Sequence, residues 1–507
     1  MHSDLSDLDE KLIDCDICII GSGPAGLAVA SKLIDKDIKF VILESGDVDP
    51  TKQHQELNKG FSRGKRKLDL ANSRLRCFGG AGRLWAGVCR PFDPSEFMAQ
   101  DSKIGGWPIN YSDLEKYYKE AADILGLNYE KFFNEDWMEE AELASRFQSF
   151  GRSDGILRGV NYQQSSFKNR DLTNRYKNTL FESKNCIVIT NATVVDMIQS
   201  KKNLVEKILI KSISGKIVPL SAKTFVLCAG AIENPRILLD SSLNQKIIEN
   251  KFLGSCFMSH PAFRGAGSLI LNDNLINPKM KNKKLKGNFG FEMNLKEREK
   301  NNVLRHNISI KPSLKSSAED KDLDKYSIIK DNISKLSIFA NRVKRKIFGG
   351  QIKAKKWNLD IGIEQEPRLE NYLKLASSKD ILGKRQVEIF WDSVSDTEMK
   401  TVLEAVKAVG RDSMLKDVGI TKVSDDLINK EIFSQDDAIN HHIGTTRMAD
   451  SPEFGIVDSN LKCFTLNNLF ISGSSVFPTS SIVNPTFSIV ALSLRLGEHI
   501  VSPPKVQ

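Results

Sequence analysis

The sequence predicts an α/β protein, α+β overall, in which a parallel-sheet domain is joined to a second, discontinuous domain. Three observations predict this fold class. A strand, a glycine-rich turn, a helix and a second strand follow one another within the first 44 residues. Short apolar strands return between about 186 and 228, and an apolar, glycine-dotted segment follows residue 438. The length of 507 residues also exceeds one ordinary domain, so we expect two lobes with separate cores.

The first element is a βαβ unit. Asp16 to Ile20 is a short apolar run typical of a buried parallel strand. A helix is expected from Ala25 to Ile34, with Pro24 in its first turn, where the missing N–H costs nothing. Ile38 to Leu43 then forms the second strand.

The turn of this unit reads Gly21-Ser22-Gly23-x-x-Gly26. Gly21 allows the tight turn, Gly23 lets the backbone approach a pyrophosphate, and Gly26 permits close packing of helix on sheet. The helix N-terminus adds free N–H groups and a positive dipole end. Glu44, at the end of the second strand, can bind a ribose hydroxyl and disfavours a 2′-phosphate. The unit predicts dinucleotide binding but does not separate FAD from NAD.

Later elements are expected from periodicity and capping. A helix follows Trp107-Pro108, with Ser112 and Glu115 as a capping box. Met399 to Val409 lines one face of another helix. Three short strands are expected at Cys186 to Thr190, Ile208 to Ser212 and Thr224 to Cys228, and another at Gln386 to Asp392. The strand ending at Cys228 runs into a helix with Pro235 near its start.

The composition excludes several classes of protein. The net charge of +9 is mild over 507 residues and does not demand nucleic acid. No apolar run approaches the roughly 20 residues of a membrane span, and the acidic N-terminus has no export signal, so we expect a cytoplasmic protein. The eight cysteines fit neither a disulfide framework nor a metal site, and Cys15-x-x-Cys18 is interpreted as packing. The basic runs 280–288 and 341–346 are interpreted as solvated faces, with an anionic ligand as the alternative.

The C-terminal part carries the second strong pattern. It contains His441-His442-Ile443-Gly444-Thr445, later Gly473-Ser474, and then Asn484-Pro485-Thr486 at the start of an apolar helix. This pattern resembles the glucose–methanol–choline (GMC) oxidoreductases, which are FAD enzymes. Segments 78–87, 105–108, 228–236, 253–261 and 365–367 also resemble parts of that family, the last of them its sugar-oxidising branch.

The resemblance implies roles for individual residues. His441, three residues before the Gly-Thr pair, would face the flavin as the catalytic base, with Asn484 beside it. Neutral imidazole suits a base near pH 7, and a side-chain amide can donate to a developing alkoxide. Cofactor contacts are expected from Gly21, Ser22, Gly23, Pro24, Gly26, Glu44, Gly79, Gly80, Ala81, Trp85, Val195, Gly230, Gly473, Ser474 and Pro485.

Other readings of the same residues stay open. His442 is the rival of His441 as base and is interpreted as a packing residue. His260 is interpreted as a structural hydrogen-bonding residue, and Asn484 could simply cap the last helix. Some relatives attach FAD to a histidine of the Gly-Gly loop, but Leu84 occupies that position here. Non-covalent FAD is therefore expected, and no metal.

The expected architecture is a Rossmann-like FAD-binding domain of residues 11–106, 190–262 and 438–507. A substrate-binding domain, built on an antiparallel sheet plus helices, takes 107–189 and 263–437. The expected reaction is oxidation of an alcohol, in a sugar, polyol or cyclic alcohol, to an aldehyde or ketone. Oxygen or another acceptor would reoxidise the flavin. A non-redox lyase and a redox-silent flavin-binding subunit remain as alternatives.

Overall fold

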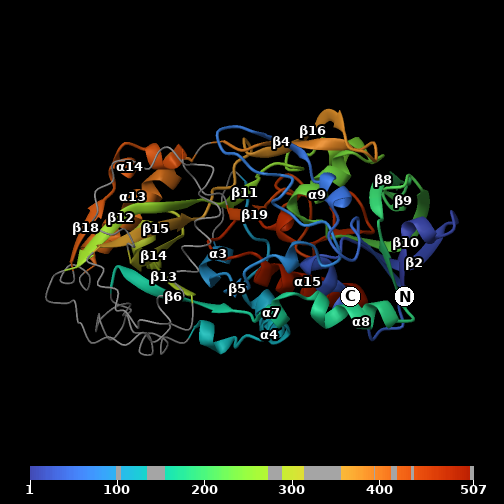
Figure 1. Cartoon of the computed structure of the whole chain (residues 1–507), viewed down its shortest axis with the longest axis horizontal. Helices are drawn as coiled ribbons and strands as arrows, with labels where there is room; N and C mark the ends of the chain where they lie inside the picture. Colours follow the sequence, from blue (N-terminus) through green and yellow to red (C-terminus); the bar gives the residue numbers. More distant parts are fainter. Residues whose placement is uncertain are drawn as a thin grey trace.

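The computed structural model describes residues 1–98, 104–133, 155–271, 288–312, 356–392, 394–412, 419–434 and 439–502. The basic runs fall outside these ranges, apart from residue 288. Two large sheets occupy opposite ends of the molecule, with the C-terminal helix α15 beside the first of them (Figure 1).

The first sheet has eight strands and forms around the βαβ unit. Its path is β1 (His2–Asp4), β7 (Cys186–Thr190), β3 (Phe40–Leu43), β2 (Ile13–Ile20), β10 (Ile217–Leu227), β9 (Val205–Lys211) and β8 (Thr193–Gln199), with β20 (Leu469–Ile471) paired to β10. Pairing is parallel from β1 to β10 and to β20, and antiparallel at β9 and β8. The strand ends of β2, β3 and β10 therefore meet at one edge.

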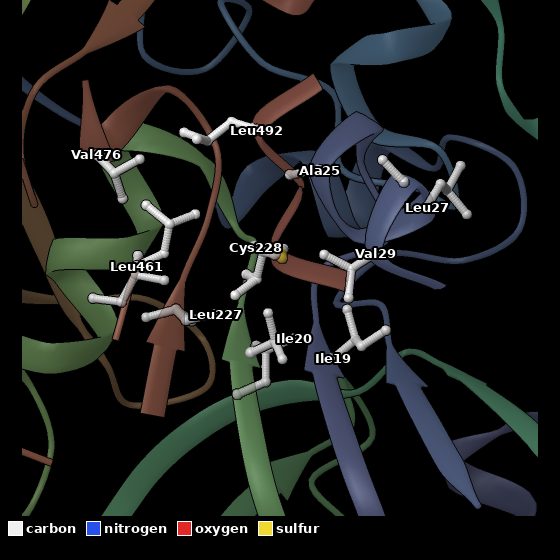
Figure 2. Close-up of a cluster of buried hydrophobic side chains, with 14 of the residues drawn as sticks. Ile19, Ile20, Ala25, Leu27, Val29, Leu227, Cys228, Leu461, Val476 and Leu492 are labelled. Carbon is white, nitrogen blue, oxygen red and sulfur yellow. The ribbon is translucent and has the colours of Figure 1, made fainter. Parts of the chain in front are cut away.

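Buried helices cover this sheet. α1 (Pro24–Ser31) begins directly after the glycine turn, and Ala25 to Ala30 are all buried. It packs against α15 (Thr486–Val501), which also contacts α4 (Ser112–Leu125). Figure 2 shows side chains of β2, α1 and the end of β10 gathered with Val476 and Leu492 from the C-terminal part. The core beneath the turn is thus built from both ends of the chain.

The second sheet has seven strands, all antiparallel. Its order is β18 (Gly419–Val423), β12 (Ala262–Leu271), β15 (Lys356–Ile363), β14 (His306–Pro312), β13 (Asn288–Met293), β6 (Leu157–Gln164) and β5 (Val88–Cys89). α13 (Asp396–Arg411) packs on it through Val402, Val406 and Val409, and begins with a capping box of Ser395 and Glu398. The antiparallel second sheet and the Rossmann-like first sheet confirm the predicted fold class.

Two smaller sheets lie between the large ones. β16 (Tyr372–Lys379), β17 (Arg385–Phe390) and β4 (Gly60–Arg63) form a sheet that packs on α9 (Gly230–Leu239), seen above α9 in Figure 1. β11 (Met258–His260) pairs antiparallel with β19 (Ile439–Ile443). The β16–β17–β4 sheet joins strands from both predicted domains, so the domain limits stay a prediction.

The remaining helices are short. They are α2 (Lys52–Glu56), α3 (Pro94–Met98), α7 (Phe167–Arg170), α8 (Thr173–Glu182), α10 (Gln245–Ile248), α11 (Leu295–Asn301) and α14 (Asp425–Ile428). Among the described residues, no helix combines the length and apolar character that a membrane crossing requires. All eight cysteines are free and buried, and the described residues hold no metal-binding cluster.

Two local predictions were wrong. Ser112 is already inside α4, because the helix cap is Tyr111, and the Asp113 carboxylate accepts from the Asn110 backbone N–H. Pro235 lies inside α9 rather than near its start, because that helix begins at Gly230, directly after β10. The predicted strand Cys186 to Thr190 is confirmed with its limits.

Candidate active site

A cavity of about 590 Å³ opens at the edge where β2, β3 and β10 end. Most of the predicted site residues line it, although they come from segments far apart in the chain. These are Gly21, Ser22, Gly23, Pro24, Glu44, Gly80, Ala81, Trp85, Gly230, His441, Gly473, Ser474, Asn484 and Pro485. Gly26, Gly79 and Val195 do not line it.

The glycine turn has the geometry that its sequence predicts. Gly21 has φ +103°, a conformation that favours glycine. A Cβ on Gly26 would lie 1.9 Å from the Gly21 carbonyl oxygen, so only glycine allows α1 to pack here. A Cβ on Gly23 would meet nothing within 4 Å, and Gly23 lines the cavity. Gly23 therefore leaves room for a ligand to approach the backbone, whereas Gly26 serves the turn itself.

Glu44 ends β3 beside this turn. Its carboxylate accepts from the Ser22 backbone N–H and hydroxyl and from the Gly46 N–H at 2.8 Å. Burial raises the pKa of Glu44. The Gly-Gly loop is also bound to Ser22, because the Gly79 N–H donates to the Ser22 hydroxyl at 3.1 Å. Gly79 therefore holds a residue of the cavity wall without lining the cavity itself.

Val195 lies where β8 shifts its register against β9, between Val194 and Asp196. Such an irregularity changes which side chains point to a given face. Val194, not Val195, lines the cavity. A bulge of this kind leaves no clear signal in a single sequence.

A buried group of charges lines the cavity near α9, and sequence reasoning missed it. Glu233 lies 2.5 Å from Arg74, 3.1 Å from Arg76 and 3.3 Å from Arg236. Burial alone would raise the pKa of Glu233, but Arg76, Arg236 and Arg74 together hold it well below its usual range. Burial lowers the pKa of Arg74 to about 10. The Arg-x-Arg spacing just before the Gly-Gly loop was the available signal.

Histidines and an amide also line the cavity. His441 Nδ1 lies 2.9 Å from His260 Nδ1, and His260 Nε2 lies 3.0 Å from the Ser480 carbonyl oxygen. The Asn484 side-chain amide donates to the Val88 carbonyl at 2.9 Å. Burial, with a smaller contribution from His260 and His442, lowers the pKa of His441 well below 6.5. Its ring is therefore neutral near pH 7.

His442 also lines the cavity, but its contacts differ from those of His441. It is buried, and its ring stacks on Phe257 with centroids 5.9 Å apart. Burial, then Arg74, lowers its pKa to about 3. Its backbone carbonyl accepts from the Ser474 hydroxyl at 2.6 Å. Both the ring packing and the main-chain bond tie His442 to the wall.

The residues present fit an FAD molecule. A carboxylate stands at the end of β3, where a ribose would bind. The glycine turn and the start of α1 offer backbone N–H groups to phosphates. Gly230 has φ +86° and open space where a Cβ would stand, so the backbone of α9 can also be approached closely. The imidazole of His441 and the amide of Asn484 line the same cavity and would be available to a substrate beside the flavin.

Comparisons with known proteins agree with this site. The family model described as GMC oxidoreductase matches residues 367–493, a range that contains His441 and Asn484. The fructose dehydrogenase large subunit of Gluconobacter japonicus is 21% identical over 98% of this chain and 100% of its own length. The chain is therefore similar to GMC oxidoreductases, and the matched range includes both candidate catalytic residues.

Solved structures show the same fold. A variant of Aspergillus oryzae formate oxidase, studied for its effect on FAD modification, has a TM-score of 0.61 with 16% identity, covering 98% of this chain and 100% of that one. Pyridoxine 4-oxidase from Mesorbium loti has a TM-score of 0.57 with 15% identity, covering 96% and 99%. The chain is an FAD-dependent enzyme acting on CH–OH donors, which confirms the predicted cofactor and enzyme class.

Proposed function

We propose that this chain is a GMC oxidoreductase that oxidises a secondary or primary alcohol of a sugar, polyol or cyclic alcohol, with His441 as the base. The observation that carries the proposal is the neutral, half-buried imidazole of His441 on the wall of a cavity that Asn484 also lines. A neutral imidazole can take the hydroxyl proton as the hydride leaves the same carbon. Bound FAD supplies the hydride acceptor.

Asn484 has the second role in this proposal. Its amide nitrogen donates one hydrogen to the Val88 carbonyl, which holds the side chain in place. An amide nitrogen carries two hydrogens. The second can be donated to a substrate oxygen as negative charge builds there, without bringing a charge of its own. Asn484 precedes α15 but is not its cap, since Pro485 holds that position. This favours a role in the cavity over helix capping.

The substrate class rests on the names of two relatives. The whole-length relative is named a fructose dehydrogenase. A second relative, the 2-methyl-1,2-propanediol dehydrogenase of Mycolicibacterium austroafricanum, is 37% identical over 60 residues, 12% of this chain and 11% of its own. Both names describe polyhydroxylated small molecules. Oxygen or another small acceptor, or a redox partner, would then reoxidise the flavin.

We also propose that FAD is held without a covalent bond. Leu84 lies in the Gly-Gly loop with 64% of its surface exposed and lines the cavity. Its side chain has no atom that can bond to a flavin. Denaturation in acid or detergent should release all the yellow colour into the filtrate, and colour retained on the precipitated protein would contradict this.

An anaerobic stopped-flow screen of flavin absorbance tests the function. Sugars, polyols and simple alcohols are mixed with the holoenzyme, and air is then admitted. Bleaching by one group of substrates supports the proposal and names the substrate class, while the rate of colour return separates oxidase from dehydrogenase. A yellow protein that no alcohol bleaches, yet that cleaves a cyanohydrin, would support a lyase instead. One that does neither would support a redox-silent subunit.

A further inference from the structure

His260 is the residue whose interpretation changes most between sequence and structure. Its Nε2 lies 3.0 Å from the Ser480 carbonyl oxygen. A carbonyl only accepts, so His260 Nε2 must carry the proton. Burial lowers the pKa of His260 to about 4, so the ring is neutral near pH 7 and holds only this one proton. His260 Nδ1 is therefore an acceptor, and the donor in the 2.9 Å contact must be His441 Nδ1.

We infer that His260 is a positioning residue for the reaction, which fixes His441 in the tautomer with its proton on Nδ1 and its lone pair on Nε2. This inference rests on the proposed role of His441 as base. The alternative tautomer would place a proton on Nε2, and that atom could then only donate to a substrate hydroxyl. A wrong tautomer leaves the geometry intact but removes the base.

The Ser480 carbonyl, which accepts from His260, is held in place by further hydrogen bonds. The Gln365 backbone N–H donates to the Ser480 hydroxyl at 2.9 Å, and that hydroxyl lies 3.2 Å from the Gln365 carbonyl. The Gln365 side-chain oxygen accepts from the Ser259 N–H at 2.9 Å, next to His260 in β11. Gln365, Ser480 and His260 are all at most 2% exposed. The Ser480 carbonyl therefore cannot turn away without breaking several buried hydrogen bonds.

Because the partner of His441 is a neutral imidazole, it affects the pKa of His441 differently from a carboxylate. A carboxylate beside Nδ1 would fix the same tautomer but would also raise the pKa of His441. Here the groups that face His441 are His260 on β11 and His442 beside it on β19, and both lower its pKa. Arg74, from the loop before the Gly-Gly loop, faces His442 and acts in the same direction. His260 thus orients the base and leaves it unprotonated over a wide pH range.

The proton balance of the reaction follows directly. The substrate O–H bond breaks and its proton moves to His441 Nε2, while the C–H bond gives its electron pair to the flavin as hydride. His441 then carries protons on both nitrogens, and its Nδ1–H keeps donating to His260. The hydrogen bond that sets the starting tautomer is therefore present before and after proton transfer.

The tautomer can be read without any activity. In holoenzyme with ¹⁵N-labelled histidine, the imidazole nitrogen shifts of His441 are assigned by comparison with His441→Gln. We expect a protonated Nδ1 and an unprotonated Nε2 in the wild type at pH 7. In His260→Leu the two tautomers should mix. A protonated Nε2 in the wild type, or an unchanged spectrum in His260→Leu, would overturn the inference even where His441 is the base.

Kinetics of flavin reduction give the second readout. His260→Leu should slow reduction roughly 10²-fold, and His260→Asn should recover much of the loss, because the Asn side-chain oxygen can accept from His441 Nδ1. His260→Asp should move the acid limb of the pH profile upward by about one unit or more. His306→Asn removes another buried histidine, in β14, and controls for general damage. An acid limb of His260→Asp that coincides with the wild type would contradict the role assigned to His260.

Discussion

Two parts of the cavity wall, which we call the backbone end near Glu44 and the side-chain end near His441, differ in what they are built from. The end near Glu44 is mostly backbone, with glycines and a helix N-terminus held in one continuous stretch of 24 residues, from Gly21 to Glu44. The end near His441 is made of side chains, and its partners His260 and Asn484 come from elsewhere in the chain. A cofactor site made of backbone groups can be formed by residues that are neighbours in the sequence. A site made of side chains depends on how strands that are distant in the sequence pair. We therefore expect substitutions at the backbone end to affect folding or FAD binding, and substitutions at the side-chain end to affect flavin reduction.

The largest expected effect separates two glycines of the backbone end. Gly26→Ala should prevent folding, because its Cβ would lie 1.9 Å from the Gly21 carbonyl oxygen. Gly23→Ala should leave the melting temperature of the apoprotein unchanged, because its Cβ would meet no protein atom within 4 Å. FAD affinity in Gly23→Ala should fall by about tenfold, roughly 1.4 kcal/mol, measured by titrating apoprotein with FAD. Equal FAD affinity in Gly23→Ala and wild type would remove Gly23 from the cofactor site.

At the side-chain end, His441→Ala should leave FAD binding intact and slow substrate oxidation. Anaerobic flavin reduction should slow by roughly 10²-fold or more, with FAD content unchanged. His499→Gln serves as the control, since His499 lies in the last turn of α15 and does not line the cavity. A His441→Ala variant as fast as wild type would show that another group takes the proton.

Acid should also act on the side-chain end through folding. The pKa values of His260 and His442 are lowered to about 4 and about 3, and that of His441 lies well below 6.5. Between pH 6.5 and 4 the unfolded chain binds more protons than the folded one, so stability falls as the pH falls. At pH 5 His260 and His442 each lower the stability by about 2 kcal/mol relative to pH 7.

Urea unfolding at pH 7 and pH 5 measures this effect. His442→Gln should make the drop between the two pH values smaller by about 2 kcal/mol. The same drop in this variant and wild type would mean that His442 is not buried as a neutral ring.

The smallest effect concerns Asn484. Asn484→Ala should slow flavin reduction by about tenfold, through loss of one donor to the substrate oxygen. Asn484→His should keep more of the rate than Asn484→Ala, because an imidazole can also donate there. The limiting rate of reduction is the measurement, with bound FAD checked by absorbance. If Asn484→Ala kept the full rate, a hydrogen bond from this side chain would not be part of the reaction.

The backbone end could be predicted from sequence because its parts are local. The strand, the turn at Gly21 and the helix follow in order, and each glycine has a steric reason. His441 and Asn484 were found through a resemblance to a family, not through periodicity. The link from His441 to His260 could not be predicted, since it depends on pairing of β11 with β19 across 181 residues.

Two other features of the cavity could not be predicted from the sequence, for similar reasons. Arg74, Arg76 and Arg236 converge on Glu233 only because the loop before the Gly-Gly segment folds over α9. Their charges look ordinary in a Lys- and Arg-rich sequence. The register shift in β8 that puts Val194 rather than Val195 on the cavity wall is a backbone irregularity. A resemblance to a family does not show such an irregularity in this chain.

The parallel pairing of β20 with β10, and of β10 with β2, has a consequence for how the enzyme is made in the cell. Strand β20 and the residues Gly473, Ser474 and Asn484 leave the ribosome long after β2 and β10. Since domains fold as the chain emerges from its N-terminus, the dinucleotide turn is complete long before the cavity that it serves. A growing chain therefore leaves the edge of β10 at Phe225 to Leu227 unpaired until β20 has emerged. FAD, arriving after β20 has docked, would act as the final ligand that stabilises the closed sheet.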